Sequence, residues 1–153
     1  MPSRPRRSRV DAVAQFAADA NAARTAACSR LAVHPDHALR LVHLAAEHAL
    51  DGLRALYGMP ADAPATDLLE VEEAPGPLRA YLSAWVSAAR TAPAEPTVAD
   101  VDRLLDAAWP LVTVLSAYAK RLLPARYGPP VAEPLVLAET AVEQHDDEAE
   151  RRG

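Results

Sequence analysis

The segment around residues 43–58 concentrates the side chains that could do acid–base chemistry. At 3.6 residues per turn, its ionisable groups fall on one side of a helix, opposite an apolar face. Imidazole titrates near neutral pH, so a histidine oriented by a carboxylate, with arginines beside it, could hold and act on a phosphate group. The alternative is a solvated helix face, on which each i,i+4 pair contributes only about 0.2–0.5 kcal/mol. The pattern alone favours the solvated face. The polar stripe consists of Arg40, His43, Glu47, Asp51 and Arg54.

Other residues with catalytic or metal-binding chemistry are few. His34, His37 and His43 lack a cysteine partner, and no Glu-x-x-His pair of the di-iron type occurs, so we expect no metal and no cofactor. Cys28 lies in an alanine-rich helical segment and is expected to be buried. The five glycines are scattered rather than gathered in a phosphate-binding loop. A Gly-x-Ser-x-Gly element is also missing from the sequence.

Composition and charge exclude several broad classes. With 153 residues the chain has the length of one domain, and its apolar residues are mostly Ala, Leu and Val, which favours helices over sheets. No apolar run approaches the roughly 20 residues of a membrane span. The arginine-rich N-terminus has no apolar segment behind it, unlike a secretory signal. One cysteine suits a reducing compartment, so we expect a cytoplasmic protein. With a net charge of −5, neither DNA nor a membrane is expected as a partner.

Start and stop signals predict four helices. Capping-box patterns open the first helix at Ser8 and the fourth at Thr97, each with an aspartate three residues later. Pro35 begins the second helix, Gly58 ends it, and Pro77 begins the third. The segment between the second and third helices is a loop with one short helical turn over residues 66–70. The expected helices are 8–32, 35–58, 77–92 and 97–123.

Each predicted helix carries an apolar stripe that must be buried in a shared core. In the fourth helix Pro110 lies inside the stripe, so we expect a kinked but continuous helix. His48 lies on the flank of the second helix and is expected to pack against a neighbour. The aromatic residues at helical spacing are expected to be core or interface anchors: Tyr81, Trp85, Trp109 and Tyr118. The stripe of the fourth helix is Val98, Val101, Leu105, Ala108, Val112, Leu115, Ala119 and Leu122.

Four such stripes joined by short connections predict an all-α fold, an antiparallel bundle of four to five helices with disordered termini. Residues 1–8 form a basic disordered arm in this interpretation, residues 9–123 the helical bundle, and residues 124–153 a proline-rich and then acidic tail. A weak helix over residues 135–144 of the tail is an open alternative.

Three blocks of the bundle resemble HEPN domains, and the resemblance is strongest to an actinobacterial HEPN-like family. The blocks are His43-Leu-Ala-Ala followed by Leu56-Tyr-Gly, then residues 69–78 leading into the helix with Tyr81 and Trp85, then residues 102–108 continuing to Leu123. They span roughly residues 10–123. The resemblance implies a HEPN-like bundle that is commonly dimeric and is associated with RNA cleavage or nucleotide binding.

HEPN ribonucleases carry an Arg, four to six residues, and then a His, usually late in the bundle. Here Arg30 and His37 have that spacing but straddle the first helix-to-helix turn, and the helices after Pro77 contain no histidine. We therefore expect a non-catalytic homodimeric module that binds RNA, a nucleotide or a partner protein. One alternative is a metal-independent ribonuclease of toxin type, with Arg30, His37 and His43 as candidates. The other is a plain helical protein-interaction module.

Overall fold

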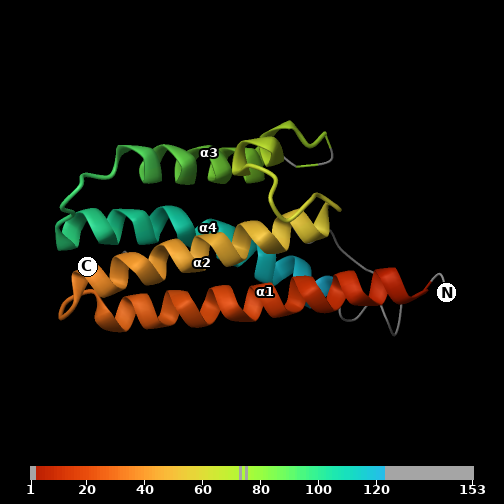
Figure 1. Ribbon diagram of the computed structural model, residues 1–153, viewed down its shortest axis with the longest axis horizontal. Coiled ribbons are helices and arrows are strands. Elements are labelled where there is room, and N and C mark those ends of the chain that lie inside the picture. The colour runs from red at the N-terminus through yellow and green to blue at the C-terminus, as the bar shows by residue number, and fades with distance from the viewer. Residues whose placement is uncertain (1–2, 73, 75, 123–153) are drawn as a thin grey trace.

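Every regular element that the structure describes is helical. The computed structural model describes residues 3–72, 74 and 76–122, with side chains from Arg9 onward. The predicted tail, including the weak helix over 135–144, lies outside these residues. The described part is all-α, as predicted, and forms a helical bundle (Figure 1). Its elements are α1 (Ser3–Arg30), α2 (Pro35–Leu56), the 3₁₀ helix η1 (Ala65–Glu70), α3 (Gly76–Thr91) and α4 (Val98–Leu122).

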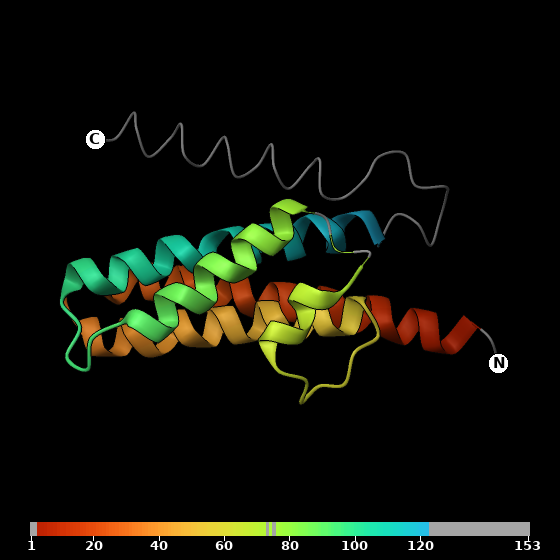
Figure 2. The ribbon, with the colours of Figure 1, turned by 90° about the horizontal axis from the view of Figure 1, so that it is seen from above.

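Helices α1 and α2 lie on one side of α4, and α3 lies on its other side (Figure 1). Helices α1 and α2 run antiparallel and side by side, and their interface is the most extensive in the fold (Figure 1). Helix α4 packs on both of them and also on α3, so it touches each of the other three α-helices. Helix α3 lies across the outer side of α4, with η1 packed beside it (Figure 2). This arrangement makes α4 the central helix of the core.

The α1–α2 pair is built from small side chains. From Arg9 onward, the buried residues of α1 are Val13 and otherwise alanines, at spacings of three and four. Small side chains let two helix axes approach closely, because the interaxial distance is set by the residues at the contact. The alanines buried on these two helices are Ala17, Ala20, Ala23 and Ala27 on α1, and Ala38, Ala45, Ala46 and Ala49 on α2.

Helix α4 is buried on more than the one predicted face. Residues 111–115 are all buried, and five consecutive residues cover every direction around a helix. The single stripe predicted from the sequence was therefore incomplete. Its first member was also wrong, because Val98 is 45% exposed at the beginning of the helix. Pro110 interrupts nothing, since α4 runs unbroken from Val98 to Leu122 as predicted, and its ribbon changes direction in the C-terminal half (Figure 1).

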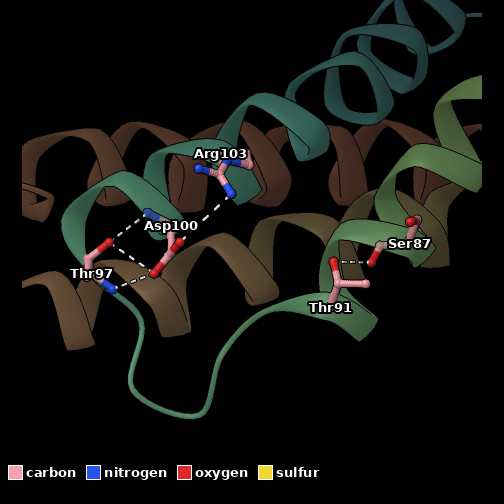
Figure 3. A network of polar contacts seen from close by, with 5 residues as sticks. All are labelled: Ser87, Thr91, Thr97, Asp100 and Arg103. Carbon is pink, nitrogen blue, oxygen red and sulfur yellow. Dashed lines mark hydrogen bonds and ion pairs between the residues drawn. The ribbon is translucent and has the colours of Figure 1, made fainter.

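Most helix ends lie where the local signals place them. Pro35 occupies the first turn of α2, and Gly58 follows its end with a φ of 69°, a conformation that glycine adopts without strain. At the start of α4, Thr97 and Asp100 form a reciprocal capping box, in which each side chain accepts a hydrogen bond from the other residue's backbone N–H at 2.9 and 3.2 Å (Figure 3).

The start of α1 was predicted wrongly. The helix begins at Ser3 rather than at Ser8, so residues 3–8 of the predicted arm are helical in their backbone. Pro5 falls in the first turn, where its missing N–H costs no intrahelical hydrogen bond. Arginine is a good helix former, so α1 extends past the capping-box signal at little cost.

Candidate functional site

The predicted polar stripe of α2 is divided between solvent and packing. Arg40 and Glu47 are exposed, whereas His43, Asp51 and Arg54 are partly buried. The exposed members share their face of the helix with Leu44, which is 41% exposed. The five side chains therefore do not gather into one cluster.

His43 is partly buried and contacts the core. Its ring lies edge-on to the indole of Trp85 on α3, with ring centroids 5.5 Å apart and an interplanar angle of 68°. Trp85 is only 5% exposed, so the predicted role of this residue as a core anchor is confirmed. An edge-to-face aromatic pair contributes about 0.5–1.5 kcal/mol beyond the area that it buries. This contact connects α2 to α3.

Arg54 fastens a loop. Its Nε donates a hydrogen bond to the carbonyl oxygen of Ala63 at 2.8 Å, and its Nη1 donates to Oδ1 of Asp51 at the same distance. The Arg54 side chain is only 13% exposed. Arg79 of α3 makes a similar contact, because its Nη2 donates to the carbonyl oxygen of Val71 at 2.7 Å. Both arginines therefore hold the segment between α2 and α3 against the helices.

His48 packs on α1, as predicted. Its ring centroid lies 6.5 Å from that of Phe16 in a tilted arrangement. Its Nδ1 is buried and makes no hydrogen bond with the described residues. His48 therefore contributes to the fold through the packing of its ring.

A set of polar contacts between α1 and α4 was not predicted from the sequence. The guanidinium of Arg24 lies 3.9 Å from the ring centroid of Trp109, a cation–π geometry. Asn21 donates from Nδ2 to the hydroxyl of Ser116 at 2.6 Å. Burial lowers the pKa of Arg24 below its ordinary value, and the neighbouring Cys28 opposes that shift. The spacing of Asn21, Arg24 and Cys28 by three and four residues was the only signal of a shared face.

Cys28 itself is exposed, so its expected burial was wrong. The alanine-rich composition of α1 is shared by its buried and its exposed faces, and composition therefore could not place the thiol. The exposure of the Cys28 thiol is determined by the positions of α2 and α4 around α1.

Arg30 and His37, the pair with ribonuclease-like spacing, lie on either side of the α1–α2 turn. Arg30 is the last residue of α1, and its carbonyl oxygen accepts the backbone N–H of His34 at 2.7 Å. His37 is in the first turn of α2. Both side chains are exposed. The structure therefore places them at one end of the bundle, in water.

A shallow hollow lies between the end of α3 and the start of α4. It has a volume of about 50 Å³ and is lined by residues such as Thr91, Asp100 and Arg103, which Figure 3 shows around the loop. Pockets that bind small molecules usually measure roughly 300–1,000 Å³, so this hollow does not have the size of a nucleotide site.

In residues 3–72, 74 and 76–122 no group of three or more His, Cys, Asp or Glu side chains is placed to hold a metal ion. Among the same residues, no helix has the length and apolar character to cross a membrane.

Comparison with known proteins returns no relative. No family model matches the chain, and no curated protein or solved structure matches it. The resemblance to HEPN domains therefore depends on the three sequence blocks alone and stays a prediction.

Proposed function

We propose that this chain is a non-catalytic, HEPN-like binding module that acts as a homodimer and contacts its partner polypeptide through the outer face of α2. The observation that carries the proposal is the exposed set of Arg40, Leu44 and Glu47, two opposite charges with a large apolar side chain between them. Surfaces of this mixed character suit protein recognition, in which an apolar centre is surrounded by polar groups.

Two of the predicted catalytic and binding groups already have structural partners. His43 packs on Trp85, and Arg54 binds Ala63 and Asp51. A general base must reach a substrate proton at about 2.6–3.2 Å, and an electrophilic cation must point at the developing charge. Because these two residues make their contacts within the bundle, they support a binding module rather than an enzyme.

The charge of the chain also favours a polypeptide over RNA. A protein that binds nucleic acid normally presents clustered Lys and Arg, whereas the α2 face carries acidic as well as basic groups and the whole chain has a net charge of −5. RNA and nucleotide binding remain predictions of the HEPN resemblance. They are tested by fluorescence anisotropy with a labelled short RNA and by thermal shift with nucleotides.

The test of the proposal combines mass and activity. Purified full-length chain is expected to have the mass of a dimer by light scattering, and to leave a labelled single-stranded RNA intact. A monomer at high micromolar concentration would contradict the homodimer. Cleavage that disappears in a His37→Ala variant, but persists in the matched His34→Ala variant, would contradict the non-catalytic assignment.

A toxin-type ribonuclease is the second candidate, and the exposure of Arg30 and His37 at the same end of the bundle favours it. Exposed groups can approach an RNA phosphate, and histidine can transfer protons near neutral pH. Expression in a bacterial host distinguishes the candidates. The ribonuclease predicts growth arrest that His37→Ala relieves, and the binding module predicts normal growth with either sequence.

A further inference from the structure

The exposed face of α2 has a regular spacing. His37, Arg40, Leu44, Glu47 and Asp51 follow one another at intervals of three, four, three and four residues. This spacing places them in one row along the helix. The first four are exposed, and the side chain of Asp51 is 37% exposed. The five residues, here called the α2 row, form the outer ridge of the helix.

The basic residues of the α2 row lie on one side of its centre, and the acidic residues lie on the other. Arg40 lies four residues before Leu44, and Glu47 lies three residues after it. His37 and Asp51 each lie seven residues from Leu44, on opposite sides. The row is therefore basic toward the N-terminus of α2, apolar at the centre and acidic toward the C-terminus.

We propose that the α2 row binds the α2 row of a second copy of this chain, antiparallel and across a two-fold axis near Leu44. In that arrangement Arg40 faces Glu47 of the second copy in both directions, and the two copies of Leu44 meet on the axis. The inference rests on the proposed function, because it identifies the polypeptide that the outer face of α2 contacts as the second copy in the homodimer.

The symmetry of the charges selects a second copy as the occupant. In a two-fold interface, a residue i that contacts residue j of the partner requires that j contact i in return. The α2 row satisfies this condition by itself, because reversing its direction exchanges its basic and acidic halves. A parallel pairing would instead place Arg40 beside Arg40 and Glu47 beside Glu47, which repels.

The flanks of the α2 row supply further apolar area. Leu41 is partly buried on one side, and the His48 ring on that side packs on Phe16 of α1. On the opposite side, the His43–Trp85 contact lies between α2 and α3. Because these flanking side chains already pack within the bundle, little of their side-chain freedom is left to lose when two copies associate.

Charge exchange tests the pairing. Sedimentation equilibrium is measured on the wild type, Arg40→Glu, Glu47→Arg and the double variant, with circular dichroism to verify folding. Each single variant places like charges opposite each other twice per dimer, and we expect its dissociation constant to rise about 10-fold or more, which corresponds to at least about 1.4 kcal/mol. The double variant restores opposite charges and is expected to return to near the wild-type value. Arg90→Glu on α3 changes the net charge as Arg40→Glu does, and is expected to dimerise like the wild type.

Crosslinking tests the position of the axis. A Leu44→Cys variant in a Cys28→Ser background is expected to form a disulfide-linked dimer under mild oxidation, because a residue on a two-fold axis meets its own copy. Val98→Cys in the same background is the control, since Val98 is comparably exposed at the start of α4. Equal crosslinking of the two variants would overturn the inference.

The outcomes separate this inference from the proposed function. A wild-type dimer that neither single charge variant weakens would overturn the α2 pairing alone and leave the homodimer standing. Single variants that weaken the dimer without rescue by the double variant would overturn the antiparallel arrangement. A wild-type monomer would overturn both.

Discussion

The imidazole of His43 on α2 packs edge-on against the indole of Trp85 on α3, with their ring centroids 5.5 Å apart. The two helices have no close backbone approach, so these long side chains bridge the gap between them. A residue that looks like a catalytic histidine in the sequence therefore contributes to the way α3 is seated on the bundle.

Removal of this contact should destabilise the fold in proportion to the area lost. Trp85→Ala is expected to lower the free energy of unfolding by about 3–5 kcal/mol, because it leaves a cavity in the core. His43→Ala should cost less, and in a double-mutant cycle the two residues should couple by about 0.5–1.5 kcal/mol. Urea unfolding followed by circular dichroism measures each value. The absence of coupling would show that the rings do not interact in solution.

Gly52 should tolerate no side chain. A Cβ at this position would overlap the side chain of Leu115 on α4. Gly52→Ala is therefore expected to destabilise the protein by about 1–3 kcal/mol through overpacking, although alanine is the better helix former. Gly76→Ala is the matched control, since a Cβ there would meet nothing within 4 Å. If Gly52→Ala unfolds at the wild-type urea concentration, α2 and α4 are not as closely packed as described.

The capping box of α4 should make stability depend on acidic pH. Hydrogen bonds from the backbone N–H and then the hydroxyl of Thr97 lower the pKa of Asp100 below its ordinary value of 3.8, and Arg103 adds to this effect. A carboxyl group whose pKa is depressed on folding stabilises the native state at higher pH, and this contribution is lost as pH falls through the depressed value. As the pH is lowered from 7 to strongly acidic values, the midpoint temperature of thermal unfolding should therefore fall less steeply in Asp100→Asn than in the wild type.

Thr97→Ala tests the same cap from its other side. Loss of an N-cap hydroxyl typically costs about 0.5–2 kcal/mol, and the substitution also removes a hydrogen bond that lowers the Asp100 pKa. In Thr97→Ala, the free energy of unfolding should be lower, and its decrease at acidic pH should also be smaller than in the wild type. A Thr91→Ala variant at the end of α3, where the hydroxyl donates to the Ser87 carbonyl oxygen, serves as the comparison (Figure 3).

Arg54 should control the order of the loop that follows α2. Arg54→Ala removes the hydrogen bonds to Ala63 and Asp51, and we expect faster amide hydrogen exchange at residues 59–64 with little change in the core helices. Arg54→Lys should not restore protection, because a single ammonium cannot reproduce the planar two-sided contact. Arg103→Ala removes a 3.9 Å ion pair whose arginine is 76% exposed, and should leave this loop unchanged.

The helix class and most helix ends were predictable from local sequence. Pro35, Gly58 and the Thr97–Asp100 box act through the backbone of their own turn, so their effect does not depend on the rest of the fold. Where a local signal failed, at Ser8, it failed because a helix former on its N-terminal side could continue the helix past a cap.

The environment of each functional-looking side chain was decided by tertiary structure. Periodicity assigned His43 and Arg54 to the polar side of α2, but it could not reveal that Trp85 and the Ala63 carbonyl would approach them from other segments. The same reason explains the burial of residues 111–115 of α4 on all sides and the exposure of Cys28. A periodic pattern specifies which face of a helix is apolar, whereas burial depends on how many neighbours pack around it. The sequence alone thus determined that this chain forms helices and where most of them end. The packing of α1 and α4 against α2, together with the Trp85 and Ala63 contacts, decided which of the polar residues of α2 remain available to a partner.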